Sequence, residues 1–257
     1  MSVTIRLLSL DCRLKNMKIA LIGYGKMGHI IERIALERGH EVVSKVDVDN
    51  QEEFESEAFA SADVAIEFTV PAKAVENYRK AWAVGVPVVS GTTGWNAVLP
   101  ELKVEIAEKG YTLFWASNFS LGVNIFFELN RRLATMMNRY ADYDVDMTEI
   151  HHTEKKDAPS GTAITLAEGI LENLDRKDEW VLVDGQGSID DSQLGIEALR
   201  EGKVPGTHIV RYDSAVDSIT IKHEAKSREG FALGAVVAAE FLVGKPAGFY
   251  SMSDLMK

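Results

Sequence analysis

Cysteine is nearly absent from this sequence: Cys12 is the only one in 257 residues. A single cysteine cannot form a disulfide within the chain, and it cannot supply the thiolates of a cysteine-based zinc site. The sequence also lacks any run of about 18 apolar residues, which argues against a transmembrane helix. These absences are typical of a cytosolic protein, so we expect a cytoplasmic location.

Basic residues are also scarce relative to acidic ones. The chain has 28 Lys and Arg against 39 Asp and Glu, which gives a formal net charge of −11. Proteins that bind nucleic acid or acidic lipid present a basic surface, so neither partner is expected here. Hydrophobic residues make up 46% of the chain, which is ordinary for a folded enzyme and too high for intrinsic disorder.

Residues 1–16 show no hydrophobic period and no signal-peptide cleavage site. A second methionine, Met17, then opens the sequence MKIALIGYGKMG, which is typical of a first strand and turn. We therefore predict that 1–16 is an unstructured N-terminal extension, from an upstream start codon or a cloning remnant, rather than an ordered extra strand.

Strand and helix patterns alternate from Met17 to about residue 118. Short apolar strands are expected at Lys18–Ile22, Val42–Val46, Asp63–Phe68, Val86–Val89 and Tyr111–Ala116. Helices are expected at Lys26–Arg38, Pro71–Val84 and Ala97–Lys109. This alternation predicts an α/β domain of the Rossmann type, with a parallel sheet covered on both faces.

The second half has a different pattern. A long helix is expected at Leu121–Tyr140, with an apolar stripe made of Ile125, Phe126, Leu129, Leu133 and Met136. The other elements expected are a helix at Ser160–Leu174 and strands at Tyr143–Ile150, Trp180–Val183, Thr207–Tyr212 and Ser218–His223. These indicate an α+β domain with a mixed or antiparallel sheet. The final helix, Phe231–Val243, has the character of the first domain and is expected to return to it.

The turn after the first strand has the pattern G-x-G-x-x-G. It consists of Gly23, Tyr24, Gly25, Lys26, Met27 and Gly28. Such a turn allows close approach of a pyrophosphate to the backbone and to a helix N-terminus, although it also occurs as a plain connector. Asp47 ends the second strand, 19 residues beyond Gly28, where an acid suits the hydroxyl groups of an adenosine ribose. We therefore predict a dinucleotide site.

The dinucleotide is NADH or NADPH. Asp47 is followed by Val48 and Asp49 rather than by an arginine, and Lys45 precedes it. An arginine commonly accommodates the 2′-phosphate of NADP, so NADH should be accepted at least as well as NADPH.

Two further turns follow parallel strands, at the edge where α/β sheets place ligands. The cofactor contacts predicted there are Gly91, Thr92, Thr93, Ala116, Ser117, Asn118 and Phe119. Ordinary turn chemistry explains the same residue types, but their position at this edge favours contact with a nicotinamide.

The densest chemistry lies in the segment Glu149-Ile150-His151-His152-Thr153-Glu154-Lys155-Lys156-Asp157-Ala158-Pro159-Ser160-Gly161-Thr162-Ala163. A histidine can exchange a proton near neutral pH, a lysine supplies positive charge, and a Ser-Gly-Thr helix start offers free N–H groups to a carboxylate. A structural histidine pair is the alternative. No metal site is predicted, because adjacent strand histidines point to opposite faces and no third ligand has convincing spacing.

The runs HHTEKKDAPSGTA, GYGKMG, GTTG, ASNFSLGVN and IKHEAKSREGFALGAV together resemble the dihydrodipicolinate reductase family. The resemblance implies NAD(P)H-dependent reduction of a cyclic dicarboxylate, 4-hydroxy-tetrahydrodipicolinate, in the diaminopimelate route to lysine. It further implies that His151 is a catalytic proton donor or acceptor and that Lys155 is the second catalytic proton donor. The substrate-binding residues implied are His152, Ser160, Gly161 and Thr162.

The same resemblance implies a dinucleotide-binding domain over 17–118, with the return of 229–257, and a substrate-binding and tetramerisation domain over 119–228 that forms a homotetramer. Two other functions fit the glycine turn. A different amino-acid dehydrogenase would not need the histidine–lysine motif. A dinucleotide sensor without catalysis would be expected to have lost His151 or Lys155, and both are present.

Overall fold

The computed structural model describes residues 16–183 and 189–257. The predicted extension therefore lies outside the described residues, except for its last residue. The chain divides into two compact units. One contains the described residues up to Ser117 together with Ala232–Lys257, and the other is Asn118–Phe231. None of the described helices is long and apolar enough to cross a membrane.

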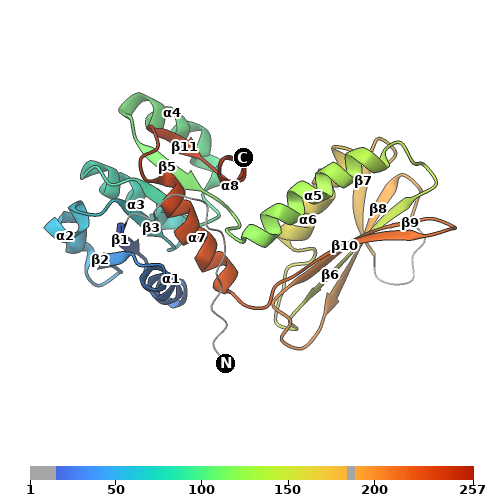
Figure 1. The fold of residues 1–257 in the computed structure, drawn as a ribbon, viewed down its shortest axis with the longest axis horizontal. Helices are drawn as coiled ribbons and strands as arrows, with labels where there is room; N and C mark the ends of the chain where they lie inside the picture. The colour runs from blue at the N-terminus through green and yellow to red at the C-terminus, as the bar shows by residue number, and fades with distance from the viewer. Residues whose placement is uncertain (1–15, 184–188) are drawn as a thin grey trace. The chain divides into compact units, whose positions relative to one another are not determined.

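The first unit is built on a six-stranded sheet in the order β11-β5-β4-β3-β1-β2, in which every pairing is parallel (Figure 1). Its strands are β1 (Lys18–Ile22), β2 (Glu41–Val46), β3 (Val64–Glu67), β4 (Val88–Ser90), β5 (Thr112–Trp115) and β11 (Gly248–Tyr250). Its helices are α1 (Lys26–Glu37), α2 (Glu57–Ala60), α3 (Pro71–Ala83), α4 (Leu99–Lys109), α8 (Met252–Leu255) and most of α7 (Glu229–Leu242). Two short 3-10 helices cover Gln51–Glu55 and Asn96–Val98.

Both faces of this sheet are buried, which confirms the predicted Rossmann-type unit. One core contains Ala20, Ala65 and Val88 from the strands, packed with side chains of α2, α3 and α4. Phe114 of β5 packs against Phe241 of α7, and the centroids of the two rings are 6.0 Å apart. The turns that follow these strands therefore project from a sheet whose central strands are buried on both faces.

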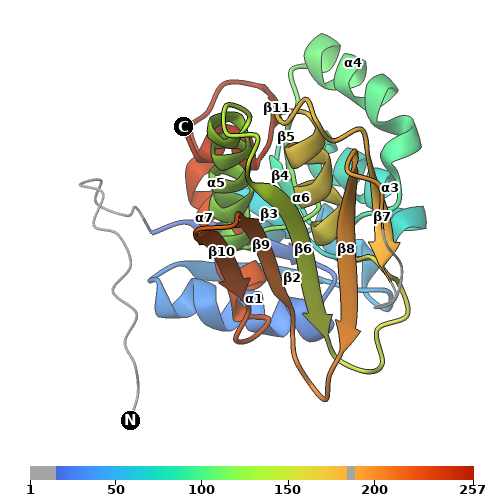
Figure 2. The same ribbon diagram turned by 90° about the vertical axis from the view of Figure 1, so that its right-hand side faces the viewer.

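The second unit has a five-stranded mixed sheet in the order β10-β9-β6-β8-β7 (Figure 2). Its elements are β6 (Asp144–His151), β7 (Glu179–Val183), β8 (Gln193–Arg200), β9 (Thr207–Asp213), β10 (Ser218–Glu224), α5 (Leu121–Met137) and α6 (Gly161–Leu171). The pairs β6–β8 and β7–β8 are parallel, and β6–β9 and β9–β10 are antiparallel. Side chains of α5 and α6 pack on one face of this sheet.

Three details differ from the sequence predictions. Strand β8 was not predicted, although it lies between β6 and β7. Strand β11 and the helical segments between residues 51 and 60 were also not predicted. The stripe expected on α5 is largely wrong, because Ile125, Leu129 and Met136 are 54%, 46% and 63% exposed, and α5 instead buries smaller or polar residues such as Ala134 and Asn130.

Candidate functional site

The glycine turn between β1 and α1 has the geometry that its sequence predicts. Gly23 has φ +89°, and a Cβ there would lie 2.1 Å from the carbonyl oxygen of Phe68. A Cβ on Gly28 would lie 2.5 Å from the carbonyl oxygen of Gly23. Nothing lies within 4 Å of a Cβ placed on Gly25, which begins α1 without a side-chain cap. The first and third glycines therefore close the turn, and the second leaves its backbone open to a ligand.

Two cavities adjoin this turn, and Gly25, Phe68 and Thr69 line both. The larger, of about 510 Å³, is also lined by Gly23 and Asp47. The smaller, of about 460 Å³, is lined by the predicted residues Lys26, Met27, Gly91, Thr92 and Thr93. A glycine turn opening into such cavities is a site that fits a dinucleotide.

The other predicted cofactor residues line neither cavity. The hydroxyl of Tyr24 bonds Glu32 and accepts a hydrogen bond from Lys45, and Gly28 is buried against the turn. Ala116 and Ser117 end the first unit, whereas Asn118 and Phe119 begin the second. Asn118 bonds the start of α5, since its side-chain oxygen accepts the N–H of Ser120 at 2.9 Å.

In the second unit, β6 ends at His151, and α6 begins after Ser160. The Ser160 hydroxyl caps α6 by accepting the N–H of Ala163, so this serine is buried and already used. The N–H groups of Gly161 and Thr162 belong to the first turn, where they have no acceptor within the helix. Lys155 lies in the intervening loop, and its ammonium group pairs with Asp157 at 2.7 Å.

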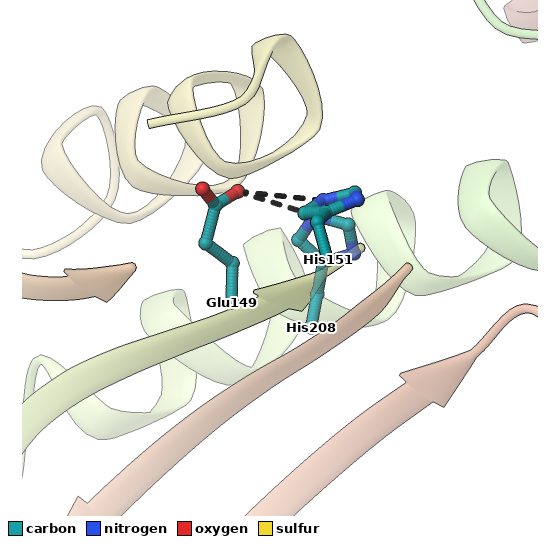
Figure 3. A group of neighbouring side chains, drawn as sticks. All are labelled: Glu149, His151 and His208. Carbon is teal, nitrogen blue, oxygen red and sulfur yellow. Dashed lines mark ion pairs between the residues drawn. The ribbon is translucent and has the colours of Figure 1, made fainter. Parts of the chain in front are cut away.

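A buried cluster lies under this segment and consists of Glu149, His151 and His208 (Figure 3). Glu149 and His151 are two residues apart on β6 and therefore share a face of the sheet. His208 is the register partner of Glu149 on β9. The nearer carboxylate oxygen of Glu149 lies 3.6 Å from Nε2 of His151 and 3.8 Å from Nε2 of His208.

Glu149 and Arg200 connect this cluster to the loop. Glu149 accepts the N–H of Ser160 at 3.0 Å and pairs with the guanidinium group of Arg200 at 3.3 Å. Arg200, the register partner of His151 on β8, also donates to the backbone carbonyls of Lys155 and Asp157. Arg200 thus links the loop that carries Lys155 to the buried carboxylate of Glu149.

Burial dominates the electrostatics of the two histidines. It lowers the pKa of His151, with Lys155 and Arg200 adding to the effect and Glu149 opposing it. Burial also lowers the pKa of His208 to about 4, so its imidazole is neutral at physiological pH. Nε2 of His151 is buried and makes no hydrogen bond among the described residues, and it lies 3.6 Å from the carboxylate of Glu149.

The same cluster supplies the one set of metal-type donors found in the described part of the chain, with donor atoms within 4.8 Å of one another. Sequence spacing offers no third ligand beside His151, since His208 is distant in the sequence and is brought in by the pairing of β6 with β9. Both oxygens of Glu149 are already engaged, by Ser160 and Arg200, and Arg200 adds positive charge. These surroundings do not favour a cation, and the absence of a metal stays a prediction.

Sequence reasoning assigned no role to Glu149, Arg200 or His208. The signal for Glu149 is its spacing of two residues from His151 within a strand pattern. The other two residues are brought in by strand register, which has no local signature.

Two family models match the chain. One is described as the N-terminus of dihydrodipicolinate reductase and covers residues 17–119, and the other is described as its C-terminus and covers residues 122–256. The chain belongs to the dihydrodipicolinate reductase family. Membership confirms the resemblance predicted from the motifs and implies a nicotinamide cofactor.

Members of the dihydrodipicolinate reductase family share much of this sequence. The 4-hydroxy-tetrahydrodipicolinate reductase of Christiangramia forsetii is 50% identical over 241 residues, which cover 93% of this chain and 98% of that protein. That of Methanopyrus kandleri is 44% identical over 197 residues, covering 76% of this chain and 71% of the relative.

The fold is also similar to a solved family structure, a dihydrodipicolinate reductase from a Paenisporosarcina species with dipicolinate bound. The TM-score is 0.72, with 22% identity over 92% of this chain and 97% of that one. At this identity the likeness shows the shared fold, and it confirms the predicted fold class.

Proposed function

We propose that this chain reduces 4-hydroxy-tetrahydrodipicolinate to tetrahydrodipicolinate, in the diaminopimelate route to lysine, with NADH or NADPH as the reductant. The observation that carries the proposal is the junction of β6 and α6. It combines a buried histidine beside the Glu149 carboxylate, a loop lysine and a helix N-terminus, in a chain of this reductase family.

The substrate carboxylates are bound by groups of the second unit. The N–H groups of Gly161 and Thr162, at the start of α6, hold one carboxylate, assisted by the partial positive charge of the helix terminus. Lys155 exchanges its ion pair with exposed Asp157 for a pair with the substrate. His152 is half-buried beside this loop and supplies a further contact. Ser160 acts mainly by capping the helix.

Proton transfer is assigned to His151. When bound, the reduced nicotinamide would supply a hydride to the conjugated C=N/C=C system that forms once the 4-hydroxyl group leaves as water. His151 would supply or relay the one proton that the ring carbon or nitrogen then takes up, and Lys155 would stabilise the negative charge or protonate the departing hydroxyl group. Because burial lowers the pKa of His151, its protonated, proton-donating form is populated only at a lower pH than in an exposed histidine.

The cofactor would be held by the glycine turn, Asp47 and the Gly91–Thr93 turn of the first unit. We assign NADH a rate at least equal to that of NADPH. The half-buried Asp47 lines the larger cavity, and the nearby Lys45 is engaged by Glu32. The lysines that line this cavity, Lys73 and Lys80, both pair with Glu76.

A lysine substitution tests the site. Lys155→Ala should lower kcat by about a hundredfold or more, because a charged donor to the substrate is lost. The matched control is Lys156→Ala, since Lys156 is the exposed neighbouring lysine and is not assigned to the site. NADH binding by Lys155→Ala, measured by fluorescence, should equal that of the wild type. Near-normal turnover in Lys155→Ala would contradict the assigned role.

We further propose that the second unit assembles a homotetramer. Two features support this proposal. The helices of the second unit pack on one face of its sheet, and α5 has three largely exposed apolar side chains, Ile125, Leu129 and Met136, that contact with another subunit could bury. Light scattering of the purified chain tests the proposal, and a monomer would contradict it. A cytoplasmic location and the absence of nucleic-acid partners stay predictions from composition.

A further inference from the structure

The first unit contains a buried carboxylate that the proposed chemistry does not use. Glu67 ends β3 and is 0% exposed. It accepts hydrogen bonds from the hydroxyl groups of Ser90 at 2.6 Å and Thr92 at 2.9 Å, and also from Thr69. Burial raises the pKa of this carboxyl, and the three hydroxyl donors oppose the rise. Burying a carboxylate costs free energy, so we expect Glu67 to have a role that accounts for its position.

The hydrogen bonds of Glu67 converge on one turn residue, Thr92. The Thr92 hydroxyl donates to Glu67 while accepting the N–H of Thr69 at 2.8 Å. The Thr92 N–H donates to the hydroxyl of Ser90 at 3.3 Å. Its carbonyl oxygen accepts the indole N–H groups of Trp95 at 2.7 Å and Trp115 at 2.9 Å. Every polar group of Thr92 is therefore held.

This fixed residue lies in the wall of the smaller cavity, together with Thr69, Gly25 and Lys26. The neighbouring Gly91 packs so closely on Phe68 that a Cβ would lie 2.2 Å from that ring. The turn after β4 is thus locked against the segment after β3, and both face the opening of the glycine turn.

We propose that Glu67 is a positioning residue for the cofactor: it holds the Gly91–Thr93 turn in its binding conformation before the dinucleotide arrives. The inference rests on the proposed dinucleotide site. The physical reason is that a turn ordered in advance loses no conformational entropy on binding, so more of the contact energy contributes to affinity. The carboxylate suits this task because it accepts several hydroxyl donors at once, each through a charge-assisted bond.

Glu67→Gln tests the inference, because an amide accepts hydrogen bonds on one oxygen only and at least one hydroxyl donor loses its acceptor. The matched control is Tyr78→Phe. Tyr78 is fully buried and bonds Ser90 at 2.6 Å, at the end of the same network away from Thr92. Thr92→Val and the double variant Glu67→Gln/Thr92→Val complete a cycle. Dissociation constants for NADH come from quenching of tryptophan emission, and unfolding free energies from urea titration.

We expect Glu67→Gln to weaken NADH binding about fivefold to tenfold and Tyr78→Phe less than about twofold, although both lose stability. The double variant should bind NADH as weakly as Thr92→Val alone, because Glu67 acts through Thr92. Wild-type affinity in Glu67→Gln, an equal loss in Tyr78→Phe, or additive losses in the double variant would each overturn the inference. A wild-type chain that binds neither NADH nor NADPH would instead overturn the proposed function, and the inference with it.

Discussion

Two buried glutamates, Glu67 in the first unit and Glu149 in the second, each accept several donors at the end of a strand. Both lie beside turns assigned to ligand binding. A buried carboxylate is stable only where such donors surround it, so each one fixes the groups that stabilise it. In the second unit these groups are the start of α6 and Arg200, which in turn holds the loop of Lys155.

Replacing Glu149 should change the pH dependence of kcat/KM. Glu149 raises the pKa of His151, so Glu149→Gln should lower that pKa further and move the alkaline fall of kcat/KM to lower pH. The variant should also lose about 1–3 kcal/mol of stability, since Arg200 is left partly buried without its counter-charge. A pH–rate profile with its alkaline limb unchanged would contradict this role of Glu149.

At the residue scale, the sequence predicts those site residues that lie close together along the chain. His151, Lys155 and Ser160 were found together because they lie within one segment of the chain. His208 and Arg200 were not, because they meet this segment through the registers of β6 with β9 and with β8, and Glu149 received no role because its partners come from those strands. Register depends on packing across the whole sheet, and no local residue pattern encodes it.

Helices and strands whose ends are marked by turn or cap residues could be predicted from the sequence. Strands that form only by pairing with distant parts of the chain could not. The strand–turn–helix unit at Gly23–Gly28 was predicted because glycine spacing encodes its backbone. Strand β8 was missed because its sequence, QLGIEALR, contains Glu197, Ala198 and Leu199, which favour helix. Pairing with β6 and β7 overrides that preference. The face of α5 was only partly predicted: Phe126 is buried as expected, but the buried face continues through Asn130, Ala134 and Met137.

The start of α6 provides a test at this scale. Ser160→Ala removes the helix cap and should cost about 1 kcal/mol. The contact of its hydroxyl with His208, 3.2 Å away, is also lost. Because the capped terminus is assigned to the substrate carboxylate, KM for the dicarboxylate should rise while NADH affinity is unchanged.

The matched control for this test is Ser120→Ala, since Ser120 caps α5 through the N–H of Val123. This variant should lose similar stability without a change in KM for the dicarboxylate. An equal rise of KM in both variants would show that α6 has no special role. Urea titrations and initial-rate kinetics supply the two measurements.

On the scale of the whole molecule, we assign the dinucleotide site to the first unit and the acid–base and anion-binding groups to the second. A net charge of −11 is compatible with two anionic ligands, because in this proposal the anions are held locally by backbone N–H groups and by Lys155. Composition therefore argues against partners that bind a broad basic surface, such as nucleic acid, and it does not bear on the local sites.

Global stability should depend on pH through His208. The folded-state pKa is about 4, well below the ordinary value of 6.5, so the unfolded chain binds an extra proton between these limits. The neutral ring therefore contributes its full stability above pH 6.5 and loses it as the pH falls to about 4, a change of roughly 2–3 kcal/mol. Unfolding free energies of the wild type and His208→Gln should converge over this window. Parallel curves would contradict the assignment.

The most direct test of the central claim is a coupled assay in which the chain receives freshly formed 4-hydroxy-tetrahydrodipicolinate and the loss of reduced-nicotinamide absorbance is followed with NADH and NADPH in turn. The account predicts substrate-dependent oxidation that Lys155→Ala abolishes, with NADH at least as effective as NADPH at limiting concentration. Oxidation of neither cofactor would contradict the reductase function. A tenfold advantage of NADPH would contradict the role given to Asp47.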